Sequence, residues 1–92
     1  MVNFYVYILE CNDGKKYYGH TNNLTRRLTE HKNGKVRYTK NKRPIQLVWF
    51  DRYLNRNEVS LEERKLKSMH DKRVINRMIN SMPKGAVKAY EI

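Results

Sequence analysis

The sequence predicts one small α+β domain in which three strands are combined with three helices. Two runs of apolar and β-branched residues, at 4–9 and 45–50, have the character of strands. Apolar residues recur at helical spacing in the segments that follow residues 22 and 55. A chain of 92 residues is long enough for one hydrophobic core and too short for two domains. We therefore expect a single domain over residues 1–82 and a short loop or tail over 83–92.

The first strand is predicted at 4–9, where every residue is apolar or aromatic. Such a run is typical of a strand that is covered on both faces, and it indicates a central position in the sheet. The Asn-Asp-Gly sequence at 12–14 predicts a turn, so residues 16–21 form the returning strand of a hairpin.

The length of this turn predicts the pairing of the hairpin. If residues 12–14 form a three-residue turn, Tyr7 lies opposite Gly19 and Leu9 lies opposite Tyr17. Both tyrosines then share one face of the sheet, because side chains alternate along a strand. Gly19 has no side chain and leaves open space beside Tyr7.

The first helix follows, capped by one of the two asparagines at 22–23. Leu24 and Leu28 mark its buried side, and Arg27 and His31 fall on the same stripe at 100° per residue. Burying an Arg and a His is unfavourable unless they face a polar pocket. The phase of this helix therefore predicts such a pocket.

The remaining elements are a basic loop, a strand and two helices. Residues 33–43 contain five Lys or Arg and no acidic residue, and a third strand is predicted at 45–50. A second helix is expected at about 56–69, and a third, short helix follows Asp71. The apolar stripes of these two helices comprise Val59, Leu66 and Met69, and Val74, Ile75, Met78 and Ile79.

Charge and cysteine content indicate the partner and the compartment. The chain has 20 Lys plus Arg against 9 Asp plus Glu, a net charge of +11, which favours nucleic acid over an anionic membrane as its partner. Cys11 is the only cysteine, which fits a reducing intracellular, cytoplasmic setting. No apolar run reaches the ~18 residues of a membrane span.

Aligned in order, these pieces resemble the GIY-YIG endonuclease superfamily, and in particular its small standalone members. The resemblance rests on Tyr5-Val6-Tyr7, Tyr17-Tyr18-Gly19, Arg27 and His31, and on Glu63-Arg64-Lys65-Leu66-Lys67, and it covers roughly residues 4–79. It implies a three-stranded antiparallel sheet flanked by helices. It also implies metal-dependent hydrolysis of phosphodiester bonds in DNA. A further expectation is selectivity for DNA structure, as in repair or recombination nucleases.

The resemblance also implies roles for the residues of the predicted pocket. Arg27 matches the family arginine that contacts the scissile phosphate, which suits a guanidinium that binds phosphate oxygens in pairs. His31 would donate to the phosphate or relay a proton. Tyr7 and Tyr17 match the tyrosines thought to position or deprotonate water, and the sequence does not decide between them.

A single glutamate on the helix after the third strand holds the metal in this family, and the alignment places Glu63 there. Glu62 is the alternative, because it lies closer to the centre of the apolar stripe. A single Mg²⁺ or Mn²⁺ ion is expected, bound by one carboxylate and by phosphate oxygens. A solvated carboxylate paired with Lys67 at i+4 is the plainer interpretation of Glu63. His20 is expected to be exposed or to line the groove.

Nucleic acid is expected to contact the basic loop and neighbouring helices. Tyr38 would either stack on a base or pack under the loop. A binding module that cleaves weakly, or a subunit activated by a partner protein, are the alternatives to an autonomous nuclease. Tyr5 and Tyr18 depart from the family motifs, and the family's late asparagine has only Asn76 and Asn80 as candidates. The expected contact residues are Arg26, Lys35, Arg37, Tyr38, Lys40, Arg43 and Lys67.

Overall fold

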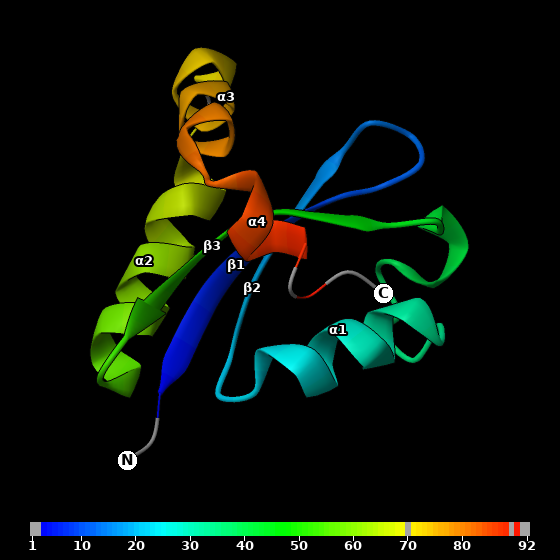
Figure 1. Ribbon diagram of the computed structural model, residues 1–92, viewed down its shortest axis with the longest axis horizontal. Coiled ribbons are helices and arrows are strands. Elements are labelled where there is room, and N and C mark those ends of the chain that lie inside the picture. Colours follow the sequence, from blue (N-terminus) through cyan, green and yellow to red (C-terminus); the bar gives the residue numbers. More distant parts are fainter. Residues whose placement is uncertain (1–2, 70, 89, 91–92) are drawn as a thin grey trace.

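The protein folds around a three-stranded antiparallel sheet, as predicted. A computed structural model describes residues 3–69, 71–88 and 90. The strands β1 (Phe4–Glu10), β2 (Lys16–Thr21) and β3 (Gln46–Tyr53) are arranged in the order β2-β1-β3. The central position of β1 is confirmed, and β2 lies at an edge of the sheet (Figure 1).

The predicted hairpin register is confirmed. Tyr7 pairs with Gly19, and Leu9 pairs with Tyr17. Gly14 adopts the left-handed conformation, with φ of 82°, that the turn requires and that glycine adopts without a steric penalty. Tyr7 and Tyr17 consequently lie on one face of the sheet, and Tyr18 and His20 point to the other.

Helices cover both faces of the sheet. Helix α1 (Leu24–Lys32) lies on one face, and α2 (Arg56–Ser68) and α3 (Lys72–Ser81) lie on the other (Figure 1). Each of these three helices is capped by a side chain that accepts a hydrogen bond from a backbone N–H of its first turn. These caps are Asn23 for α1, Asn55 for α2 and Asp71 for α3.

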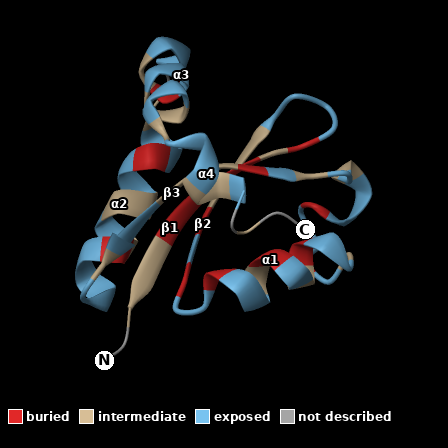
Figure 2. Cartoon of the chain, in the orientation of Figure 1, coloured by how far each residue is buried: buried red, intermediate tan, exposed pale blue. Residues whose placement is uncertain are grey.

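The two faces of the sheet carry two hydrophobic clusters that β1 separates. Val6 and Ile8 pack with residues of α2 and α3, whereas Tyr7 and Leu9 pack with Leu24 and other residues of the α1 side. All four β1 residues have no exposed surface. Figure 2 shows this buried centre in β1 and the buried inner side of α1.

Two expectations about element boundaries are corrected. Strand β3 continues to Tyr53 beyond the predicted end at residue 50, because the polar residues Asp51 and Arg52 still pair with β1 at an edge that faces water. Residues 84–88, expected to be a loop, form helix α4 (Lys84–Lys88), and Val87 packs against the cluster on the α1 side. The division at residue 82 into domain and tail stays a prediction.

The basic loop after α1 is more ordered than the sequence predicts. Gly34, with φ of 75°, ends α1, and the N–H of Lys35 donates to the carbonyl of Glu30. A 3₁₀ helix, η1 (Lys40–Lys42), follows within the loop. The chain then returns beside the hairpin turn, where the N–H of Asn12 donates to the carbonyl of Lys42 over 2.9 Å.

The helices of the described segments are short or polar. None of those helices is long and apolar enough to cross a membrane.

Candidate active site

A buried hydrogen-bonded chain connects β1, α1 and the basic loop. The Tyr7 hydroxyl lies 3.0 Å from Nε2 of His31, and Nδ1 of His31 lies 2.7 Å from Oγ1 of Thr39. None of these three side chains is exposed to solvent. The sequence predicted that His31 would face inward, and the structure adds that both of its ring nitrogens are occupied by neighbours.

The expected role of His31 in phosphate binding or proton relay stays a prediction. His31 and its partner Tyr7 both lack exposed surface, so neither side chain reaches solvent in this conformation. The sequence assigned no role to Thr39, which lies in the basic loop. Its partnership with His31 results from the folding of that loop over the end of α1, and no local pattern signals it.

Aromatic rings extend this chain from the core to the surface. The His31 ring lies edge-on to Tyr17, with ring centroids 4.9 Å apart, and Tyr7 lies 6.1 Å from Tyr17. Tyr38 continues the row, with its centroid 5.4 Å from that of Tyr17. Tyr17 is half-buried and Tyr38 is exposed, so these two rings present the outer end of the row to solvent.

Arg27 joins this cluster from α1, as its helical phase predicted. Its guanidinium lies near the hydroxyls of Tyr7 and Tyr17, and Nη1 contacts the Glu30 carboxylate at 3.1 Å. About a third of the side chain (33%) remains exposed. A guanidinium has five N–H donors, so Arg27 retains donors for an anion from solvent while it holds Glu30.

The environment determines the proton positions in this cluster. Burial, and then the positive charge of Arg27, lower the pKa of His31 from 6.5 to about 4, so its imidazole is neutral at neutral pH. Burial raises the pKa of Tyr7 despite the nearby Arg27 guanidinium. For Arg27, burial favours loss of the proton, but the interactions with Tyr7 and Glu30 outweigh it and raise the pKa. The resting cluster therefore holds a protonated phenol, a neutral imidazole and a guanidinium cation.

Gly19 is required by the packing of Tyr7. A Cβ atom at this position would lie 2.6 Å from the Tyr7 hydroxyl and 3.0 Å from a ring carbon of Tyr17. Both distances are shorter than ordinary van der Waals contact, so the phenol occupies the space that any other residue's side chain would need. The space that the sequence predicted to be open beside Tyr7 is therefore filled by the Tyr7 phenol itself.

The predicted metal ligand Glu63 lies in a second cluster with His20 and Lys67. One carboxylate oxygen contacts Nδ1 of His20, and the other lies 3.1 Å from Nζ of Lys67. The Glu63 side chain is 15% exposed. Glu63 therefore forms the ion pair with Lys67 at i+4 that the plainer interpretation of this residue predicted. The contact with His20 was not predicted, although both residues were noted.

The two clusters lie on opposite faces of the sheet, on either side of β2. Gly19 borders the Tyr7 cluster, and His20, the next residue, points to the face that α2 covers. The sequence assigned Arg27 and Glu63 to the same catalytic site and did not indicate this separation. Because β2 is an edge strand, a ligand that spans its outer edge can contact both clusters.

Glu63 fits the needs of a hard divalent cation. Mg²⁺ commonly takes one or two carboxylates and completes its coordination with water and phosphate oxygens. In the described ranges (3–69, 71–88 and 90) no group of three or more His, Cys, Asp or Glu side chains gathers as a metal site would. Glu63 is therefore a one-carboxylate candidate, and His20 supplies an adjacent nitrogen.

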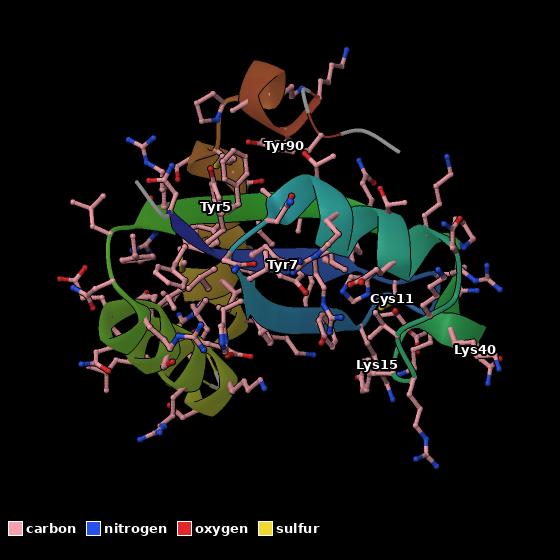
Figure 3. All side chains as sticks on the ribbon, turned by 90° about the horizontal axis from the view of Figure 1, so that it is seen from below. Tyr5, Tyr7, Cys11, Lys15, Lys40 and Tyr90 are labelled. Carbon is pink, nitrogen blue, oxygen red and sulfur yellow. The ribbon has the colours of Figure 1, made fainter. Side chains whose placement is uncertain are left out.

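The predicted nucleic-acid contacts divide into exposed and structural residues. Lys35, Arg37 and Lys40 are exposed on the basic loop. Lys15 and Lys40 lie toward the same end of the molecule, whereas Tyr7 lies between the sheet and α1 (Figure 3). Arg26 is exposed and bonds to Asn22 at 3.2 Å.

Arg43 has a structural role that the sequence did not indicate. Its guanidinium donates to the carbonyl of Lys32 at 3.1 Å and to that of Lys40 at 3.0 Å. It thereby closes the end of α1 onto the basic loop. The expected contact of Arg43 with nucleic acid stays a prediction.

Comparison with known proteins defines the class. Residues 3–77 match the family model of the GIY-YIG catalytic domain. The chain therefore belongs to the GIY-YIG family, a superfamily of nucleases whose members generally use divalent metal ions and bind nucleic acid. The resemblance noted in the sequence is thus confirmed.

Within this family the chain is similar to small proteins named UPF0213. One from Oceanobacillus iheyensis is 39% identical over 66 residues, which are 71% of this chain and 77% of the relative. Another, from Syntrophus aciditrophicus, is 43% identical over 67 residues, again 71% and 77% of the two chains. The solution structure of a UPF0213 protein from Bacillus halodurans is 30% identical, with a TM-score of 0.59 over 94% of this chain and 93% of that one.

Proposed function

We propose that this protein is an endonuclease that hydrolyses phosphodiester bonds in DNA with Mg²⁺ or Mn²⁺. The observation that carries the proposal is the convergence of Tyr7, Tyr17, Arg27 and His31 beside Gly19, with Glu63 across the same edge strand. The net charge of +11 supports a polyanionic substrate.

In this proposal the phosphodiester lies across the outer edge of β2. Arg27 holds a phosphate oxygen through its free donors and neutralises charge that develops during the reaction. Tyr17, which is half-buried, faces the phosphate and orients the attacking water. A metal ion held by Glu63 would supply Lewis-acid stabilisation of the phosphate charge.

Tyr7 and His31 support Arg27 and Tyr17, which contact the phosphate. Both are fully buried, so we assign them to positioning rather than to substrate contact. The neutral imidazole accepts from the Tyr7 phenol when its Nδ1–H donates to Thr39. The chain thereby fixes the phenol that borders Arg27 and Tyr17.

A nicking assay tests the proposal. Supercoiled plasmid, single-stranded DNA and branched DNA are incubated with the full chain and Mg²⁺ or Mn²⁺, beside Arg27→Ala, Glu63→Gln and the surface control Lys65→Ala. Nicking that is lost in the first two variants and retained in the control supports the proposal. Nicking that survives both Arg27→Ala and Glu63→Gln contradicts the assigned site.

A second candidate function rests on the pairing of Glu63. Its two carboxylate oxygens already contact His20 and Lys67, and it approaches β2 from the face opposite Arg27. This arrangement favours a nucleic-acid binding module with weak cleavage, or a subunit whose site is completed by a partner protein. DNA binding without nicking on all three substrates favours the module, and nicking that requires cell extract favours the partner.

A further inference from the structure

Tyr38 is an exposed aromatic ring held beside the candidate active site. Its side chain is 48% exposed, and its ring packs against Tyr17 at a centroid distance of 5.4 Å. The Lys42 ammonium lies 4.1 Å from the ring centroid, so a flexible charged side chain covers this face instead of a packed core residue. A flat ligand can displace such a cation, which is then free to bind phosphate.

A cleft of about 660 Å³ opens next to this ring. Its apolar lining comes from Tyr18 on β2, from Met69 at the end of α2 and from Ile75 on α3, and Tyr38 closes it from the side of the basic loop. The volume falls within the ~300–1,000 Å³ typical of sites for small organic groups. A flat aromatic ligand can therefore contact apolar side chains and stack on Tyr38 in this cleft.

The rim of the cleft is positively charged. Lys15, Lys16 and Lys72 line it, and Asp13 is the one acidic residue among its described lining residues. Asp13 is paired with Lys42 at 3.6 Å, and Lys16 with Glu10 at 3.4 Å. Among the described residues, no acidic side chain forms an ion pair with Lys15 or Lys72. The ligand that complements this rim carries negative charge beside its flat ring.

The cleft lies on the face of the sheet that α2 and α3 cover, which is also the face of His20 and Glu63. Lys16 and Tyr18 line the cleft, and His20 is the next residue of β2 on that face. Tyr38 links the cleft to the other face, because its ring packs against Tyr17. Three residues of a strand span about 10 Å, so the cleft lies one or two nucleotides from a phosphate at Gly19. A base stacked and paired within a duplex has both faces covered and cannot enter it.

From these observations we infer that the cleft receives an unpaired base next to the phosphate that is cut. This inference rests on the proposed function and specifies its substrate class as DNA with an unpaired nucleotide at the cleavage site. The base stacks on Tyr38, and its flanking phosphates contact Lys15 and Lys72.

The test measures binding in EDTA, so that cleavage does not interfere. Two labelled duplexes are compared, one fully paired and one with a single unpaired 2-aminopurine. Removing one base–aromatic stack costs about 1–3 kcal/mol, so Tyr38→Ala should weaken binding of the unpaired probe ~5- to 150-fold more than that of the paired probe. Tyr38→Phe keeps the ring and should retain the preference. Quenching of 2-aminopurine fluorescence by the unmodified chain reports stacking independently of any variant.

The outcomes separate this inference from the proposed function. The inference is overturned if Tyr38→Ala loses affinity equally for both probes, or if the unmodified chain shows no preference for the unpaired probe. Either result is compatible with the proposed nuclease function. Failure to bind either DNA overturns the proposed function as well. Lys72→Ala should reduce the affinity for the unpaired probe, and circular dichroism of each variant verifies the fold.

Discussion

The Tyr7 hydroxyl lies 3.0 Å from Nε2 of His31, and neither side chain has any exposed surface. The far nitrogen of the imidazole is held by Thr39 at 2.7 Å. This buried chain joins three separate segments, namely β1, α1 and the basic loop. Its integrity therefore affects both the stability of the fold and the geometry of the candidate site.

Replacing Thr39 by valine should destabilise the protein. The substitution keeps the shape of the side chain but leaves a buried imidazole nitrogen without its partner, which costs about 1–3 kcal/mol. Urea unfolding at pH 7.5 measures the change. Thr29→Val is the matched control, because Thr29 is exposed on α1 and bonds only to a backbone carbonyl of its own helix. An equal effect of the two substitutions would show that the Thr39 contact has no special importance.

Stability should fall with acidity in a way that depends on His31. Its folded pKa is about 4 against an ordinary value of 6.5, so the unfolded chain takes up a proton that the native chain excludes. The contribution is fully present above pH 6.5 and is lost as the pH falls toward 4, by on the order of 3 kcal/mol in total.

The measurement is urea unfolding of the unmodified chain and of His31→Gln between pH 7.5 and 4.5. The carboxylates and the other histidines titrate in both proteins, so the difference between the two curves isolates His31. The stability of the unmodified chain should fall more steeply. An NMR titration of the His31 ring protons gives a second readout, and a midpoint near 6.5 would contradict the assignment.

A methyl group at Gly19 should disturb the site directly. Its Cβ would lie 2.6 Å from the Tyr7 hydroxyl, and overpacking of a well-packed core typically costs about 1–3 kcal/mol. Gly19→Ala should therefore lower the urea midpoint and reduce nicking. Gly85→Ala is the control, because nothing lies within 4 Å of a Cβ there. Unchanged stability in Gly19→Ala would mean that the phenol moves freely.

Substitutions of Tyr7 and Tyr17 by phenylalanine should differ in their effect on stability. Tyr7→Phe leaves the buried Nε2 of His31 without its partner and should cost about 1–3 kcal/mol. Tyr17→Phe removes a half-buried hydroxyl and should leave the urea midpoint nearly unchanged while reducing nicking. If Tyr17→Phe nicks normally, the water-orienting role assigned to Tyr17 is wrong.

The local features of this fold could be predicted from the sequence because they depend on short-range rules. The turn at residues 12–14 determines the hairpin register, and a helical phase of 100° per residue places Arg27 and His31 on the buried stripe. Side-chain chemistry limits the cap of α1 to Asn22 or Asn23 and that of α2 to Asn55 or Asn57, and the structure has Asn23 and Asn55.

The features that the sequence did not predict depend on tertiary packing. Helical phase cannot tell which face of the sheet α2 covers, so the separation of Glu63 from Arg27 was missed. Helix α4 has five residues and contains Gly85, which is too weak a local signal, and packing of Val87 on the sheet supports it. Thr39 and Arg43 owe their roles to the return of the basic loop over α1.

Two basic residues of the loop should behave differently. Lys40 is exposed, so Lys40→Ala should weaken DNA binding for all sequences and reduce the salt slope of the binding constant by about one. Arg43 donates to two backbone carbonyls, so Arg43→Ala should lower the free energy of unfolding by about 1 kcal/mol. Fluorescence anisotropy at several salt concentrations and urea unfolding measure these effects. A loss of stability in Lys40→Ala instead would reverse the assignment.

Removal of Lys67 should strengthen divalent metal binding at Glu63. The ammonium lies 3.1 Å from one carboxylate oxygen and competes with a cation for it. An ion pair of this kind with an exposed lysine contributes about 0.2–1 kcal/mol, so Lys67→Ala should tighten Mn²⁺ binding ~1.5- to 5-fold. Lys65→Ala on the same helix is the charge-matched control and should change the affinity less. Isothermal titration with Mn²⁺ in the absence of DNA measures the affinity directly, and Glu63→Gln should abolish it. Equal effects of Lys67→Ala and Lys65→Ala would indicate a general change of charge, and Mn²⁺ binding that survives Glu63→Gln would place the metal elsewhere.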